Sequence, residues 1–194
     1  EYQLPQKINE KIMNKQTVDM VLDDIMTRGL RDASGNHIGK TIIFAQTTPH
    51  AKFIVDRFND LYPQYGGEFC RYVTYKEDYS DNLIEKFKNP DGEPTIIVSI
   101  DMMDTGVDVP EVVNLVFFKQ VKSKIKFTQM IGRGTRKCPN LFGDGRDKEC
   151  FYIFDYLGNF EFFRQNKNGK ESDVTDSVIC MLCRNRASLI AHLQ

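Results

Sequence analysis

The sequence lacks the features of a membrane or exported protein. No apolar run in its 194 residues approaches the roughly 20 needed to cross a bilayer. The opening EYQLPQKINEK is polar and charged, so it has no signal-peptide pattern. It also lacks an initiator Met, and we expect a fragment of a longer protein with no membrane partner. With 41% hydrophobic residues, the chain is long enough to bury a core.

Cysteine is scarce and scattered, which argues against a disulfide framework. An odd number without an export signal predicts reduced thiols in a cytoplasmic protein. The last two form a lone CxxC, and His192 is the one His in the last hundred residues. A zinc site needs more ligands than that, so we predict no metal site and interpret the CxxC as a helix face. The five residues are Cys70, Cys138, Cys150, Cys180 and Cys183.

A nucleotide-binding loop is also missing, although residues 34–44 (SGNHIGKTIIF) contain Gly39-Lys40-Thr41. The phosphate loop requires G-x-x-x-x-G-K-[ST] between a strand and a helix. Here Ser34 holds the first glycine position, a helix precedes the segment and a strand follows. No DE-x-[HD] magnesium box occurs anywhere. We therefore predict a turn entering a strand, in a chain without the main nucleotide-binding half of an NTPase.

Acidic residues are absent from one long window, residues 112–140, although the net charge of the chain is only -1. A local basic face there suits a phosphate-bearing partner, or it is an ordinary solvated surface. The basic residues of the window are Lys119, Lys122, Lys124, Lys126, Arg133, Arg136 and Lys137.

Strand-like and helix-like patterns alternate along the chain. Alternation of this kind predicts an α/β domain with a mainly parallel sheet, whose ligands lie at the carboxyl ends of its strands. We expect Thr48 to cap one helix and Gly29 to end another. The predicted strands are 41–46, 69–75, 95–100, 112–118 and 150–156, and the predicted helices are 6–29, 50–62, 80–89, 122–132 and 171–194.

Two stretches carry the chemical signal. DMMDTGVDVPEV (101–112) follows a buried strand, and QMIGRGTR (129–136) contains two arginines one turn apart. The spacing i, i+4, i+7 would put Gln129, Arg133 and Arg136 near one face of a helix end. Guanidinium groups match phosphate oxygens bidentately and stay charged at any working pH. The pair therefore suits a triphosphate reached from across an interface.

In this order the segments resemble the second motor domain of superfamily 2 helicases and translocases. KTIIFAQT (40–47) looks like motif IV, SIDMMDTGVDVP (99–110) like motif V and QMIGRGTR like motif VI. The resemblance covers about residues 40–156 and implies a RecA-like parallel sheet sandwiched by helices. With FDYLGNFEFF, the combination looks most like the motor (R) subunit of type I restriction-modification enzymes.

The resemblance implies roles at the nucleotide. Arg136 looks like an arginine finger, Arg133 would contact the same phosphates or the hydrolytic water, and Gln129 would lie beside them. Asp108 would pair with motif VI or the ribose, and Gly106 and Gly132 would also border the nucleotide. ATP with Mg²⁺ would be bound mainly by the first motor domain, so we expect this fragment alone to be inactive.

The resemblance also implies a DNA grip. Thr47 and Thr48 would hold a DNA phosphate at a helix start, and Thr105 would link that grip to the nucleotide. Many relatives carry a hydroxyl residue directly before the Asp that matches Asp101. This chain has Ile100 there and Ser99 one residue earlier, which makes Ser99 the candidate contact.

The implied organisation is a linker helix and loop over 1–39, the second RecA-like domain over 40–160, and a spacer with a C-terminal helical extension over 161–194. The implied protein is an ATP-dependent translocase and type I site-specific deoxyribonuclease. Its partners would be double-stranded DNA, a first motor domain, and methyltransferase and specificity subunits. Two alternatives stay open: a superfamily 2 helicase of repair or RNA metabolism, and a non-enzymatic nucleic-acid-binding α/β module.

Overall fold

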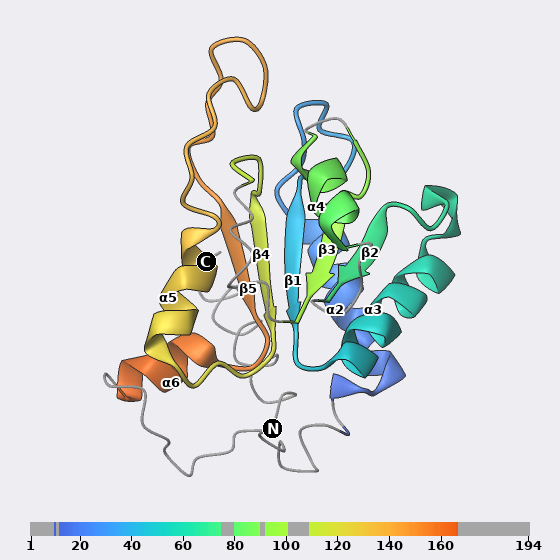
Figure 1. Cartoon of the computed structure of the whole chain (residues 1–194), viewed down its shortest axis with the longest axis vertical. Coiled ribbons are helices and arrows are strands. Elements are labelled where there is room, and N and C mark those ends of the chain that lie inside the picture. The colour runs from blue at the N-terminus through green and yellow to red at the C-terminus, as the bar shows by residue number, and fades with distance from the viewer. Residues whose placement is uncertain (1–9, 11, 75–79, 90–91, 101–108, 167–194) are drawn as a thin grey trace, which may run out of the picture.

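The computed structural model describes residues 10, 12–74, 80–89, 92–100 and 109–166 (Figure 1). They form a five-stranded sheet in the order β2-β3-β1-β4-β5. Every neighbouring pair is parallel, which confirms the predicted α/β class with a parallel sheet. The strands are β1 (Thr41–Ala45), β2 (Cys70–Val73), β3 (Ile96–Ser99), β4 (Asn114–Phe118) and β5 (Tyr152–Asp155).

Helices cover both faces of this sheet (Figure 1). Alternate residues of a strand point to opposite faces, and the central strand β1 is buried along its whole length. Ile43 and Ala45 pack in one core with α2 and α3, while Ile42 and Phe44 pack in a second core with α4 and α5. The helices are α2 (Lys15–Arg28), α3 (Thr48–Leu61), α4 (Ser80–Lys88), α5 (Lys124–Gly132) and α6 (Asn159–Gln165), with a 3-10 turn η1 (Pro63–Tyr65).

The helix starts differ from the predicted ones because side chains cap them. The predicted helix over 6–29 is interrupted at Asn14, whose backbone is extended and whose side chain accepts a hydrogen bond from the Thr17 N–H at 3.3 Å. Gly29 ends α2 as expected, with its N–H donating to the Ile25 carbonyl at 2.8 Å. The cap of α3 is Thr47 rather than Thr48, so Thr48 becomes the first helical residue.

Two elements were not anticipated, η1 and α6. The predicted helix over 171–194, with Cys180 and Cys183, lies outside the described residues. Within the described part of the chain, no helix is long and apolar enough to cross a membrane.

Candidate functional site

The two sets of predicted site residues lie at opposite edges of the sheet. Helix α5 begins after the carboxyl end of β4 and returns to the amino end of β5 (Figure 1). Its last residue, Gly132, and Arg133 therefore lie toward the amino edge of the sheet. Thr47 and Thr48 follow β1 at the carboxyl edge. Only one of the two predicted sets consequently lies at the carboxyl edge, where the sequence analysis expected ligands to bind.

Aromatic packing holds α5 against the sheet. Phe127 is 6% exposed and its ring lies 5.2 Å from that of Phe117 on β4. On its other side the ring centroids of Phe160 and Phe163 lie at 5.0 and 4.7 Å. With this face inward, Gln129 is exposed on the outside of the helix. The packing of Phe127 therefore fixes the orientation of α5 and leaves Gln129 facing solvent.

The chain leaves the helical conformation just after the end of α5. Arg133 keeps a helical backbone and donates its N–H to the Met130 carbonyl at 3.2 Å. The Thr135 hydroxyl donates to the Gly132 carbonyl at 3.0 Å. Arg136 lies beyond the helix and is exposed. Its position is therefore set by the chain after the helix, and the i+7 helical spacing is wrong for Arg136.

The two glycines of GRG differ in their surroundings. A Cβ at Gly134 would lie 2.3 Å from the Phe151 ring, so a larger residue there would displace the segment. Apart from its chain neighbours and its own helix backbone, a Cβ built at Gly132 would have no described atom within 4 Å. The steric requirement at Gly134 escaped the sequence analysis because Phe151 is far along the chain. Gly132 leaves open space beside Arg133.

Lys148 is a second residue that the sequence analysis missed. Its ammonium donates to the carbonyls of Pro110, at 2.9 Å, and Val112, at 2.6 Å. Its backbone N–H donates to the Cys138 carbonyl at 2.9 Å. Burial lowers the pKa of the Lys148 ammonium. Lys148 thus ties the segment after motif VI to the end of the predicted motif V.

At the carboxyl edge, the start of α3 is open to solvent. The Thr47 hydroxyl accepts a hydrogen bond from the His50 N–H at 3.3 Å, and Thr48 is exposed. Ser99 has no exposed surface, so it would reach a DNA phosphate only if its surroundings opened. The predicted residues Thr105, Gly106 and Asp108 lie outside the described residues.

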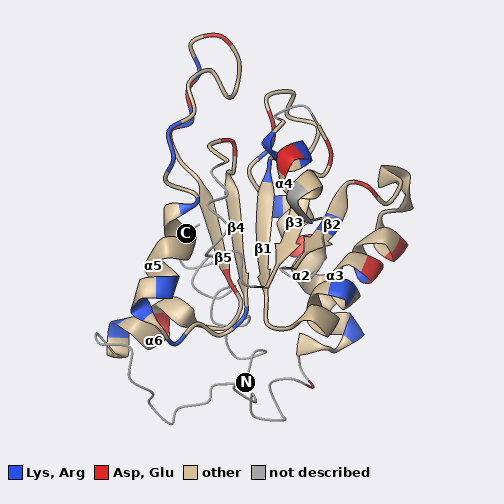
Figure 2. Cartoon of the chain, in the orientation of Figure 1, with Lys and Arg blue, Asp and Glu red and all other residues tan. Residues whose placement is uncertain are grey.

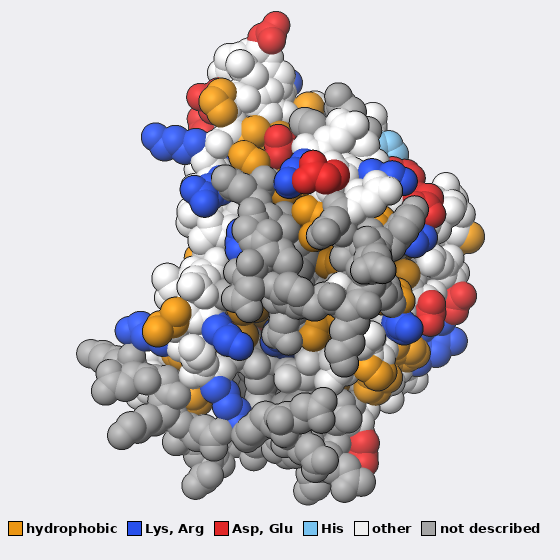
Figure 3. Space-filling view, viewed as in Figure 1, with side chains coloured by type: hydrophobic (Ala, Val, Ile, Leu, Met, Phe, Trp, Pro, Cys, Tyr) orange, Lys and Arg blue, Asp and Glu red, His pale blue; other side chains and the backbone are white. Residues whose placement is uncertain are grey.

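Positive charge gathers on the α5 side of the molecule. Figure 2 shows Lys and Arg along α5, α6 and the segment after α5, and Figure 3 shows such side chains at the surface there. Among the described residues, no group of three or more His, Cys, Asp and Glu could hold a metal ion.

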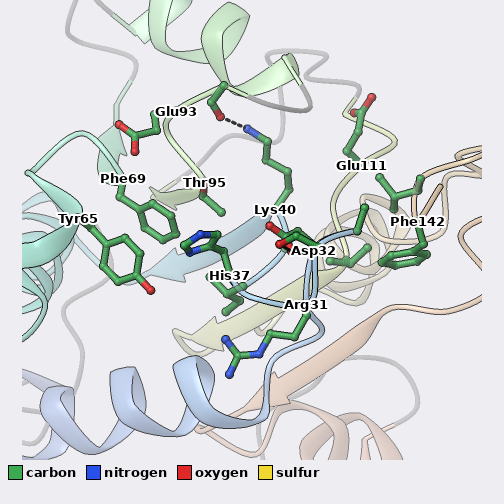
Figure 4. Close-up of a pocket in the computed structure, with 17 residues that line it drawn as sticks. Arg31, Asp32, His37, Lys40, Tyr65, Phe69, Glu93, Thr95, Glu111 and Phe142 are labelled. Carbon is green, nitrogen blue, oxygen red and sulfur yellow. Dashed lines mark hydrogen bonds between the residues drawn. The ribbon is translucent and has the colours of Figure 1, made fainter.

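Lys40 has a structural partner at the amino edge of the sheet. It is 5% exposed, and its ammonium donates to the carbonyls of Gly92, at 2.6 Å, and Pro94, at 3.0 Å (Figure 4). The adjoining pocket of about 460 Å³ is lined by the carboxylates Asp32, Glu93 and Glu111. Arg31 also lines the pocket and donates to the Met26 carbonyl at 2.8 Å. A phosphate would therefore meet three carboxylates, while the charges of Lys40 and Arg31 are already engaged. The interpretation of Gly39-Lys40-Thr41 as a turn entering a strand is confirmed by β1, which begins at Thr41.

Comparison with known families decides the identity of the fold. The model of the helicase conserved C-terminal domain matches residues 17–138. The chain belongs to this helicase domain family. Its parallel sheet with helices on both faces is the RecA-like fold of such domains. That fold is shared with domain 2 of the DEAD-box helicase Mss116p, solved bound to an RNA duplex, at a TM-score of 0.54 and 19% identity over 88% of this chain and 62% of that one.

The relatives of this helicase domain include subunits of type I restriction enzymes. The EcoKI endonuclease subunit of Escherichia coli K12 is 36% identical over 124 residues, which are 60% of this chain and 10% of that subunit. A solved fragment described as an HsdR subunit of a type I restriction enzyme from Vibrio vulnificus YJ016 has a TM-score of 0.68 at 25% identity. The alignment covers 90% of this chain and 33% of that one. The chain therefore spans a small part of its relatives.

The Lys40 contacts of the helicase domain predict a structural effect of substitution. Lys40→Met should lower the free energy of unfolding by about 1–3 kcal/mol, because the carbonyls of Gly92 and Pro94 lose their donor. Urea denaturation of the chain measures the loss, and Lys15→Met on the exposed start of α2 is the matched control. Unchanged stability in Lys40→Met would show that these two contacts do not hold the segment.

Proposed function

We propose that this helicase domain is the second motor domain of an ATP-dependent DNA translocase, the R subunit of a type I restriction enzyme. The observation that carries the proposal is the end of α5, where half-buried Arg133 and exposed Arg136 follow Gly132, whose Cβ direction is open. The similarity to type I endonuclease subunits supports the choice of translocase. The chain would work beside a first motor domain.

The arginines would act on a triphosphate held between two domains. Arg136 would place its guanidinium on the γ-phosphate, and Arg133 would bind the same phosphates or orient the hydrolytic water. Gln129 would lie beside them, with Asp108, Gly106 and Gly132 bordering the nucleotide. Mg²⁺, bound mainly by the first motor domain, neutralises charge on the β- and γ-phosphates in such enzymes. The arginines supply the remaining positive charge from this side of the interface.

DNA would be bound at the carboxyl edge of the sheet, opposite the end of α5. The exposed start of α3 offers the Thr48 N–H and the hydroxyls of Thr47 and Thr48 to a phosphate, because Pro49 has no N–H and the His50 N–H already donates to Thr47. Such contacts ignore base sequence, as a translocase requires. Thr105 would continue the grip, whereas the buried Ser99 is the weakest candidate of the predicted set.

Translocation would follow from the separation of the two sites. ATP between the domains favours a closed arrangement because Arg133 and Arg136 bind its phosphates from this side. Hydrolysis removes that connection and lets the domains part. Each domain holds the DNA backbone separately, so closing and opening produce a step along the strand.

The complete protein would combine this motor with other activities and partners. Residues 1–39 would be the linker from the first motor domain, and 161–194 would begin the next region. Double-stranded DNA, methyltransferase and specificity subunits are the proposed partners, in the cytoplasm. An ATPase stimulated by double-stranded DNA, with displacement of a triplex-forming strand by the complete protein, tests translocation. Stimulation by RNA alone would favour an RNA helicase instead.

Thr48→Glu should separate DNA binding from stability. A carboxylate in the first turn of α3 stabilises the helix through the helix dipole, but it repels a DNA phosphate. We expect the Kd for double-stranded DNA to rise about tenfold at low salt, less so as salt screens the repulsion. Fluorescence anisotropy of the complete protein measures it. Gln16→Glu, at an exposed first-turn position of α2, makes the same charge change away from the site. Equal affinities of the two variants would refute the grip at α3.

A further inference from the structure

Residues 119–121, which we call the junction, connect β4 to α5 at the carboxyl edge. The Gln120 N–H donates to the Gln46 side-chain carbonyl at 3.0 Å, which joins the junction to the residue after β1. The Lys119 ammonium donates to the Ile100 carbonyl at 2.7 Å, just after β3. Three neighbouring strands of the sheet therefore have their carboxyl ends linked at one point.

A second set of contacts fixes the junction from the side of α6. Asn159, only 2% exposed, accepts the Val121 N–H on its side-chain oxygen at 2.7 Å. Its amide donates to the Lys119 carbonyl at 3.0 Å and to the Asp155 carboxylate at 2.9 Å. The backbone on both sides of Gln120 is thereby held, and the Gln120 N–H bond to Gln46 is the contact that reaches toward α3.

Gln46 is itself tied to the start of α3. Its backbone N–H donates to His50 Nδ1 at 3.3 Å. The His50 ring is fully buried and packs edge-on to Phe118, the last residue of β4, with ring centroids 4.7 Å apart. Burial lowers the pKa of His50 to about 4, so the ring is neutral at physiological pH and its Nδ1 can accept. Within the described part of the chain His50 Nε2 has no hydrogen-bond partner, so the polar contact of the ring found there is with Gln46.

These contacts form a short physical route between the two proposed sites. It runs from the exposed turn at Thr48 through Gln46 to Gln120, and then into α5, which starts after its Ser123 cap. Helix α5 carries Gln129 on its outer face and Arg133 at its end. A shift of the α3 turn against the sheet would pull on the Gln120 backbone and reorient α5.

We propose that Gln46 is a positioning residue that couples DNA contact at α3 to the placement of the arginines at the end of α5. The coupling rests on the proposed function. Gln46 touches neither the nucleotide nor its arginines, so its effect is on the response to DNA. Coupling between distant sites is carried by packed and hydrogen-bonded elements of this kind.

Gln46→Met tests the coupling in the complete protein, because Met keeps the length of the side chain and removes its acceptor. We expect the ratio of the ATPase rate with saturating double-stranded DNA to the rate without DNA to fall about fivefold or more. The DNA-free rate and the Kd for DNA should stay within about twofold of wild type, and Gln46→Glu, which retains an acceptor oxygen, should restore the ratio. Gln64→Met, at an exposed position of η1, is the matched control.

Three results would overturn the coupling: an unchanged ratio in Gln46→Met, an equal fall in Gln64→Met, or failure of Gln46→Glu to recover the ratio. If Gln46→Met does not fold, Gln46→Ala removes the same acceptor without adding bulk, and the same ratios decide. A wild-type ATPase that ignores DNA would instead reject the proposed translocase function.

Discussion

Replacing Arg136 with Ala should lower the ATP turnover of the complete protein by about a thousandfold or more, the effect expected when an arginine finger is lost. In the proposed role the guanidinium would neutralise charge that develops on the phosphates in the transition state, so kcat should fall far more than KM rises. Arg136→Lys should recover little of the rate, because an ammonium cannot make the bidentate contact. Single-turnover and steady-state ATPase assays measure both parameters.

An arginine outside the proposed site provides the control for this experiment. Arg164 lies on α6 with 77% of its side chain exposed and pairs with Glu161 at 2.8 Å. Arg164→Ala should leave ATP turnover within about twofold of wild type, since Arg164 lies outside the proposed site. It should also keep the fold, because an exposed ion pair contributes less than about 1 kcal/mol to stability. If Arg136→Ala also kept turnover near wild type, Arg136 would not be the finger. Arg133, at the end of α5, would then be the residue to test.

Phe127→Ala should lower the free energy of unfolding of the chain by about 3–5 kcal/mol, as expected for truncation of a buried aromatic side chain. Phe127 lies between Phe117 on β4 and the rings of Phe160 and Phe163, at centroid distances of 4.7–5.2 Å. Its removal leaves a cavity between α5 and the sheet. Urea denaturation monitored by circular dichroism measures the loss.

Phe160 provides the comparison that shows whether the burial of Phe127, rather than the loss of any aromatic ring beside α5, causes the destabilisation. Phe160 contacts Phe127 from α6 but is 46% exposed, so Phe160→Ala should cost less than half as much. In the complete protein, Phe127→Ala should also reduce ATPase at temperatures where the domain remains folded, because α5 carries Gln129 and Arg133. Equal destabilisation by the two variants would show that Phe127 does not anchor α5.

The strands were predictable because of where they lie in the sheet. β1, β3 and β4 are covered on both faces, and such strands need continuous apolar, β-branched or aromatic runs. TIIFA, IIVS and NLVFF have that composition apart from Ser99 and Asn114 at strand ends. Helices α3, α4 and α5 were visible from their apolar periodicity. The motif pattern likewise indicated the helicase family from local residue types alone, since each motif is a short contiguous stretch.

Helix starts and ends were less predictable, because capping competes with periodicity. Asn14 interrupts a pattern that would otherwise continue through it, and Thr47 takes the cap from Thr48. The short α6 follows β5 directly, and its buried first residue, Asn159, is held by contacts to residues 119–121. A helix that depends on contacts with residues so far along the chain cannot be predicted from its local sequence pattern.

By itself, the sequence determined the parallel α/β architecture and the family, because burial periodicity and contiguous motifs are local properties, and it singled out the two arginines as candidates. Only the tertiary structure separated the start of α3 from the end of α5, placed Arg136 beyond its helix and engaged Lys40 with Gly92 and Pro94. It also brought Gln46 to Gln120, 74 residues away. Contacts of this kind join groups that are distant along the chain, and their partners exist only once the sheet has formed.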